Sequence, residues 1–215
     1  MRALLLYQSV TGNTEKVAGA LREGLEAEGI EVVTRRIAEA VPDDLLDFDL
    51  VCLGTPAYQF LPHRVVLDFV AERMRTHSQR GDIVVRAPKR PGKYSVVFVT
   101  YSGQHTGIDE ATTAGKYLGQ FLLHLGFAVV GEWYVVGEFH GNKEASTEGW
   151  LGDIRGRPNA ADLAEVRDRA ARLAKCLLSG EAVAPDAPAS PSDAREDADS
   201  PSGRCSSWSH KERSP

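Results

Sequence analysis

Short apolar runs alternate with amphipathic segments along the first 180 residues, and this alternation constrains the possible folds more than any other feature of the chain. Five runs have the composition of buried strands: Ala3–Tyr7, Ile30–Ile37, Leu50–Leu53, Tyr94–Thr100 and Phe127–Val136. Helical spacing of apolar residues marks the segments between and after them: Glu15–Glu28, Pro62–Met74, Asp109–Leu125 and a last helix that starts at Pro158-Asn159. Repeated strand–helix units predict a doubly wound α/β fold, in which helices cover both faces of a parallel sheet.

The stretch between the first strand and the first helix reads Ser9-Val10-Thr11-Gly12-Asn13-Thr14. A helix N-terminus presents unpaired backbone N–H groups and a partial positive charge, which together attract anions. Gly12 lets the backbone approach a ligand closely or adopt a positive φ, and Ser9, Thr11 and Thr14 supply hydroxyl groups. This stretch is therefore a candidate phosphate loop, although an ordinary turn capped by Thr11 or Asn13 would read similarly.

Three other phosphate or phosphoryl sites are excluded by the residues at the strand ends. A Walker-type loop ends in Gly-Lys-Ser/Thr, and a dinucleotide loop needs Gly-x-Gly-x-x-Gly; the stretch Ser9–Thr14 has neither. A response-regulator receiver domain needs an aspartate after the third strand and an acidic pair after the first. This chain has Gly54-Thr55-Pro56 and Gln8-Ser9 at those places.

Two further strand ends carry an aromatic residue among small ones. The third strand is followed by Gly54–Pro62 and the fourth ends in Thr100–Gly107, which contain Tyr58 and Tyr101. Parallel strands bring their carboxyl ends to one edge of the sheet, where doubly wound proteins bind ligands. The two tyrosines are therefore candidate walls for a flat ring, and the loop backbones are candidate polar partners.

The three loops resemble those of the flavodoxin family. Ser-Val-Thr-Gly-Asn-Thr is similar to the family's phosphate loop, Gly-Thr-Pro-x-Tyr to the second flavin loop of many bacterial members, and Tyr-Ser-Gly to the third. The resemblance covers residues 1–180 and implies a five-stranded sheet of order 2-1-3-4-5 that binds FMN, whose phosphate the family holds with hydroxyls and amides. The FMN-binding residues that it implies are Ser9, Val10, Thr11, Gly12, Asn13, Thr14, Thr55, Pro56, Ala57, Tyr58, Gln59, Phe60, Thr100, Tyr101, Ser102, Gly103, Gln104, His105 and Gly107.

The resemblance leaves two functions open: an electron carrier between proteins and an FMN-dependent NAD(P)H:quinone-type oxidoreductase. Carriers of this fold turn a loop peptide toward the reduced flavin, which a glycine permits, and Ala57-Tyr58-Gln59-Phe60 contains none. We nevertheless expect a carrier that serves a redox partner protein or a small-molecule acceptor, because no nicotinamide site is evident in the sequence. A protein that keeps the fold as a scaffold without flavin is a third alternative.

Two features near the loops would suit the reductase. His105 could donate a proton to an acceptor, or it is a solvent-exposed loop histidine. The polar stretch Gly137–Arg157 could bring three residues to the site or to a dimer contact: His140, Asn142 and Trp150. Its end, Leu151–Asn159, resembles bacterial flavodoxin-like proteins of unassigned role and holds two candidate anion or carboxylate contacts, Arg155 and Arg157.

Composition sets the remaining expectations. Residues 181–215 are rich in Ala, Pro, Ser and Asp and hold five of the eleven prolines, so we expect a disordered tail after a single domain over residues 1–180. Seven of the 30 acidic and four of the 25 basic residues lie in that tail, which leaves the domain nearly neutral and without a nucleic-acid footprint. The scattered Cys52, Cys176 and Cys205 indicate neither disulfides nor a metal site. No apolar run reaches the length of a signal peptide or membrane span, so we expect a cytoplasmic protein.

Overall fold

The computed structural model describes residues 1–39 and 42–181, so the predicted tail lies outside the described residues from position 182 onward. Its elements, in chain order, are β1 (Arg2–Tyr7), α1 (Asn13–Ala27), β2 (Glu31–Arg36), the 3₁₀ turn η1 (Leu45–Asp47), β3 (Leu50–Tyr58), β4 (Leu61–Pro62), α2 (Arg64–Arg80), β5 (Tyr94–Tyr101), α3 (Asp109–His124), β6 (Ala128–Val136), α4 (Lys143–Thr147) and α5 (Ala160–Ser179). No helix in the described ranges is both long and apolar enough to cross a membrane.

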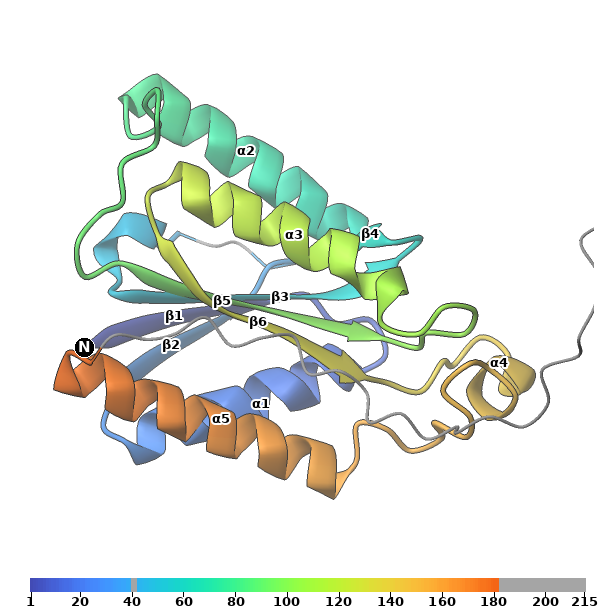
Figure 1. The fold of residues 1–215 in the computed structure, drawn as a ribbon. Coiled ribbons are helices and arrows are strands. Elements are labelled where there is room, and N and C mark those ends of the chain that lie inside the picture. The colour runs from blue at the N-terminus through green and yellow to red at the C-terminus, as the bar shows by residue number, and fades with distance from the viewer. Residues whose placement is uncertain (40–41, 182–215) are drawn as a thin grey trace, which may run out of the picture.

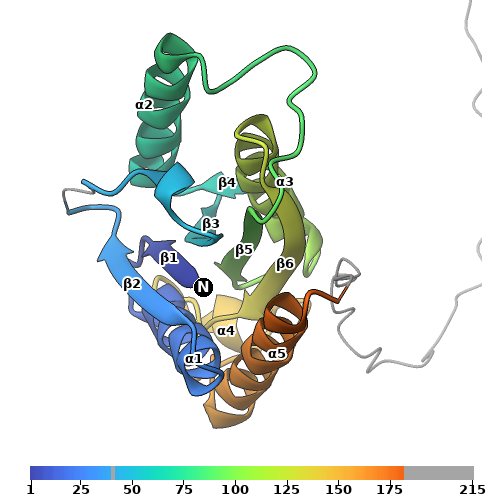
Figure 2. The same cartoon turned by 90° about the vertical axis from the view of Figure 1, so that its left-hand side faces the viewer.

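The sheet has the strand order β2-β1-β3-β5-β6, and all neighbours in this order run parallel. This confirms the predicted doubly wound order 2-1-3-4-5, with β4 as an additional short strand that pairs antiparallel with the end of β3. Figure 2 shows the strands between two pairs of helices, with β2 and β6 at the two edges.

The central strands β1, β3 and β5 are buried on both faces, which explains why their sequences are mostly apolar rather than alternating. Along β1, Ala3 and Leu5 contribute to the core under α1 and α5, whereas Leu4 and Leu6 point into the core under α2 and α3. All four residues are fully buried. Figure 1 shows these two helix pairs on opposite sides of the sheet, with α4 beyond the carboxyl ends of the strands.

Two glycines mark places where elements approach too closely for any side chain. A Cβ at Gly24 of α1 would lie 2.3 Å from the carbonyl oxygen of Arg167, so the two helices α1 and α5 touch through this position. A Cβ at Gly54 of β3 would lie 2.1 Å from the ring of Phe98 on the neighbouring strand β5. Gly54 thus has a packing role beside the ring of Phe98.

Two local predictions were wrong. The second helix does not open at Pro62 and end near Met74; it begins after His63, which caps it through its side chain, and continues to Arg80. The prediction ended the helix too early because its last turns are polar, even though His77 within them is buried. The helix ends at Gly81, which has a positive φ. The expected loop after the third strand is instead a continuation of β3 that returns as β4. The alternative interpretation of the first loop, a turn capped by Thr11 or Asn13, is not observed: the N-cap of α1 is Gly12, and no side chain in the described ranges caps the helix.

Candidate functional site

The first loop and the ends of β3 and β5 meet at one edge of the sheet, because β1, β3 and β5 are adjacent parallel strands (Figure 1). The backbone N–H of Gln8, just after β1, donates to the carbonyl oxygen of Gly54 in β3 at 3.1 Å. The hydroxyls of Thr14 and Thr100 form a buried hydrogen bond of 2.8 Å that joins the start of α1 to the end of β5. Predicted site residues 86 positions apart are thus in direct contact.

The first loop has the geometry of an anion site. Gly12 has φ +93°, and no atom lies within 4 Å of where its Cβ would be, so the space beside it is open. Its N–H donates to the hydroxyl of Ser9 at 3.1 Å, and the first helical bond runs from Lys16 to the Gly12 carbonyl. In the described part of the chain, the N–H groups of the three intervening residues, Asn13, Thr14 and Glu15, have no acceptor. Three free donors at a helix N-terminus suit a phosphate group.

Two buried side chains beside this loop have polar atoms without a partner among the described residues. These atoms are Oε1 of Gln8 and Oδ1 of Asn13, and each residue is only 7% exposed. The amide nitrogen of Asn13 is already used, since it donates to the carbonyl oxygen of Glu138 at 3.0 Å. Buried acceptors in folded proteins normally have donors, so both oxygens are suited to a ligand that carries hydroxyl groups.

The second site segment is the hairpin that joins β3 to β4. Gln59 and Phe60 at its tip have φ of +47° and +70°, and Tyr58 pairs with Leu61 across the turn. Tyr58 is 48% exposed and Phe60 57% exposed, so both rings are available to a ligand. The ring of Tyr58 also makes an edge contact with His63, at 5.2 Å between ring centroids, which supports it from the start of α2.

The third loop is held by its own hydrogen bonds. The carboxylate of Glu110 accepts from the N–H groups of His105 and Thr106, at 2.6 and 2.9 Å. The side chain of His105 is exposed, whereas Tyr101 is only 6% exposed and packs in a cluster that contains Ile154. Burial raises the pKa of Tyr101 to about 12, with the positive charge of Arg157 opposing this. Stacking of the Tyr101 ring on a flavin stays a prediction, and its burial favours a packing role.

Residues 137–157 fold back onto the third loop. The backbone N–H of Trp150 donates to the carbonyl oxygen of Gln104 at 2.8 Å, and a Cβ on Gly107 would lie 3.1 Å from the indole ring. Ile154 is buried in the cluster of Tyr101, which fixes the far end of the segment. Trp150, one of the residues of this segment that were predicted to reach the site, therefore lies against the third loop.

Other polar residues of the same segment serve local structure. Arg155 pairs with Asp153, and Arg157 pairs with Asp162 at the start of α5, so both arginines make the carboxylate contacts that were one of their predicted roles. His140 and Asn142 line a separate cavity of about 240 Å³, and the Asn142 side chain caps the short helix α4.

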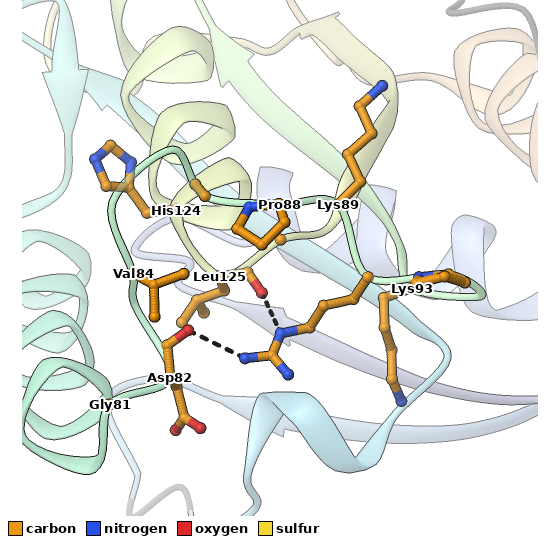
Figure 3. A pocket seen from close by; sticks show the side chains of 12 residues that line it. Gly81, Asp82, Val84, Pro88, Lys89, Lys93, His124 and Leu125 are labelled. Carbon is orange, nitrogen blue, oxygen red and sulfur yellow. Dashed lines mark hydrogen bonds between the residues drawn. The ribbon is translucent and has the colours of Figure 1, made fainter.

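A larger cavity of about 420 Å³ lies at the opposite end of the molecule, at the amino ends of β5 and β6 (Figure 3). The loop Gly81–Lys93 folds around it, and Arg90 joins this loop to the end of α3 by donating to the carbonyl oxygens of Asp82 and Leu125, each at 3.0 Å. The larger cavity is thus remote from the carboxyl ends of the strands, whereas the smaller one begins at Glu138, just after β6; neither cavity is lined by a predicted FMN residue.

The comparison with known proteins agrees with this architecture. The family model of flavodoxins matches residues 5–154. The chain belongs to the flavodoxin family.

Relatives and structural neighbours of this flavodoxin-family chain are of two kinds. It is 29% identical over 202 residues to an "NAD(P)H dehydrogenase (quinone)" of Rhizobium rhizogenes, covering 81% of this chain and 96% of that protein. A protein of the same name from Paracoccus denitrificans is 26% identical over 209 residues, covering 82% and 95%. Among solved structures, oxidised Flavodoxin 1 from Bacillus cereus superimposes with a TM-score of 0.58 at 18% identity, over 81% of this chain and 98% of that one. This last likeness shows the fold alone.

The cofactor of the flavodoxin family is FMN, as predicted from the sequence. The residues of this chain fit it: the free N–H groups of the first loop suit the phosphate, the unpartnered oxygens of Gln8 and Asn13 suit hydroxyl groups, and exposed rings at the hairpin suit the flavin. Bound FMN supplies electron and hydride transfer, and the protein supplies binding, orientation and proton sources.

Three residues of the site were missed in the sequence analysis. Gln8 was taken only as the end of a strand, Glu110 as a helix residue, and Glu138 as part of a loop. Each acts through a contact that depends on tertiary structure: the Glu138 carbonyl holds Asn13, 125 residues away, and Glu110 holds the third loop. Only Glu110 gave a local signal, as an acidic residue in the first turn of a helix.

Proposed function

We propose that this protein is an FMN-dependent NAD(P)H:quinone-type oxidoreductase whose cofactor is held by residues 9–14, 55–60 and 100–107. The backbone N–H groups of the first loop and the hydroxyls of Ser9, Thr11 and Thr14 would bind the phosphate. The hairpin with Tyr58 and Phe60 would lie on one side of the flavin ring, and the third loop on the other.

The observation that carries this proposal is the wall that residues 137–157 build on the third loop. A carrier that delivers electrons to another protein needs an open flavin edge, whereas an enzyme that reduces a small molecule needs a walled site beside the ring. Trp150 and Ile154 attach this wall to the third loop and to the core. The names of the relatives from Rhizobium rhizogenes and Paracoccus denitrificans support the same activity.

A quinone takes up two electrons and two protons to become a hydroquinone, so the site needs a proton source in addition to the hydride from the nicotinamide. His105 suits this role, because its imidazole is exposed while its backbone N–H is fixed by Glu110. We propose His105 as the donor to a quinone oxygen.

The electron carrier is the second candidate, favoured by the exposure of Phe60 at the tip of the hairpin. A ring that is 57% exposed at the outer edge of the site could contact a partner protein.

Anaerobic mixing experiments separate the two functions. If the protein is the oxidoreductase, NADH or NADPH bleaches the flavin absorption of the FMN-loaded protein, and 1,4-benzoquinone restores it over many turnovers. If neither nucleotide reduces a flavin that dithionite reduces readily, the oxidoreductase is the wrong assignment and the carrier is favoured.

A further inference from the structure

We propose that Trp150 forms the outer wall of the electron-acceptor site and stacks on the ring of a quinone. This inference rests on the proposed function and adds a binding residue for the acceptor. Trp150 is 71% exposed, the largest exposed fraction of any aromatic side chain in the described ranges. An indole ring in this position offers a large, flat surface that gains free energy when a planar ligand covers it.

The backbone around Trp150 is rigid, although its ring is exposed. Gly149 and Gly152 form a bridge across a tight turn, with a hydrogen bond of 2.9 Å from the N–H of Gly152 to the Gly149 carbonyl. Trp150 and Leu151 occupy the tip of this turn, and Leu151 packs between the third loop and the core cluster of Tyr101. The turn is thus held at both residues of its tip, so a ligand that stacks on the indole ring has little backbone to order on binding.

The position of the turn connects Trp150 with the flavin site. It lies directly against the third loop, through the bond from Trp150 to Gln104 and the close approach of the indole to Gly107. Gly107 has φ +64° and no side chain, and both properties allow this approach. A planar molecule that stacks on the indole therefore lies beside the loop proposed to hold the flavin ring.

Aromatic exposure is concentrated at this end of the molecule. Five aromatic side chains are strongly exposed in the described ranges, and four of them belong to segments at the carboxyl ends of the strands: Tyr58, Phe60, Phe139 and Trp150. The fifth, Tyr117, lies on α3 and is 37% exposed. Such a concentration marks a binding surface for an apolar ligand.

The charges near the turn favour an uncharged ligand. Glu148 is exposed two residues before Trp150, and the carboxylate of Glu110 holds the loop on which the indole rests. Two carboxylates disfavour the phosphate groups of a nicotinamide nucleotide at this wall. A quinone has no charge, and its electron-poor ring complements the electron-rich face of indole.

The test compares Trp150→Phe and Trp150→Ala with the wild type, and it uses Tyr117→Ala as a matched control for loss of an exposed aromatic ring. Binding of 1,4-naphthoquinone to the oxidised, FMN-loaded proteins is measured by equilibrium dialysis, which does not depend on turnover. We expect the Kd to rise about tenfold in Trp150→Ala and about two- to threefold in Trp150→Phe, with no change in Tyr117→Ala. In steady-state assays the KM for the quinone should rise by the same factors, while kcat and the KM for NADH stay as in the wild type.

Three results would overturn the proposal: a naphthoquinone Kd in Trp150→Ala within twofold of the wild type, a raised KM for NADH in place of that for the quinone, or a loss of FMN that is larger than the loss of quinone affinity. Failure of the proposed function is a different result, because it appears as an absence of flavin reduction by NADH and NADPH in the wild type itself.

Discussion

Gly12 offers a sharp test of the phosphate site, because Gly29 at the other end of α1 is a matched control. Both glycines have left-handed backbones, with φ of +93° and +84°, and neither has an atom within 4 Å of where a Cβ would be. Alanine at either position suffers the same conformational strain and meets no neighbour in the protein. Each variant should therefore lose about 1–2 kcal/mol of folding free energy.

The two variants differ in what a Cβ would do to FMN. At Gly12 a methyl group would occupy the open space beside the free N–H groups of Asn13, Thr14 and Glu15. A phosphate displaced from this space loses one charge-assisted hydrogen bond, worth about 1.5–3 kcal/mol. The Kd for FMN should therefore rise about 10- to 100-fold in Gly12→Ala. In Gly29→Ala it should stay unchanged.

The assay is a fluorescence titration of FMN into the apo form of each variant, with urea unfolding of the same preparations. Equal losses of FMN affinity in the two variants would mean that helix stability, and not the phosphate site, controls cofactor binding. An unchanged FMN affinity in Gly12→Ala would refute the phosphate site itself.

Three further predictions concern the flavin wall, helix packing and acid stability. Tyr58→Ala should raise the Kd for FMN about 5- to 10-fold. It should change the free energy of unfolding by less than about 0.5 kcal/mol, because this ring is half exposed. A loss of stability without a loss of FMN affinity would contradict the role of Tyr58 in the flavin site. Gly24→Ala should destabilise the fold by about 1–3 kcal/mol, because its Cβ would collide with α5. Gly19→Ala, which has open space in the same helix, should stabilise the fold by about 0.5–1 kcal/mol. Chemical denaturation gives both changes in the free energy of unfolding, and changes of the same sign would refute the close packing of α1 on α5. Burial tends to raise the pKa of Asp44, but hydrogen bonds and the charge of Arg80 hold it below its ordinary value. The stability that the Asp44 carboxylate contributes is therefore present above about pH 4 and lost as the pH falls further. Asp44→Asn should accordingly lose less stability between pH 5 and pH 3 than the wild type does. An identical loss would show that the Asp44–Arg80 pair contributes nothing.

The sequence predicted the alternation of strands and helices because the central strands are mostly apolar and each helix has a regular apolar face, whereas the order of the strands followed from the resemblance to the flavodoxin family. The last helix illustrates how far local signals reach: it was predicted to start at Pro158-Asn159, and Asn159 is its N-cap and forms a capping box with Asp162 three residues later. The hairpin Tyr58–Leu61 shows the limit of such signals. Its turn places Gln59 and Phe60 at positive φ without a glycine, which no local preference indicates.

The parts of the site that escaped prediction depend on contacts between distant segments. Residues 137–157 read as a polar loop, because their anchors are single apolar residues such as Ile154 rather than a periodic pattern. Tyr101 followed a strand like Tyr58 did, yet one ring is buried and the other exposed. That difference in exposure depends on which distant segments pack over each strand end, and the spacing of apolar residues along the sequence does not encode those contacts.

The most direct test of the account is an amide ¹H–¹⁵N correlation spectrum recorded as FMN is added to the apo protein. Binding at the carboxyl ends of the strands predicts shifts concentrated in residues 9–14, 58–60 and 100–107, with the amides of Asn13, Thr14 and Glu15 among the largest. Shifts concentrated instead around the cavity of residues 81–93 would contradict the assignment of the site.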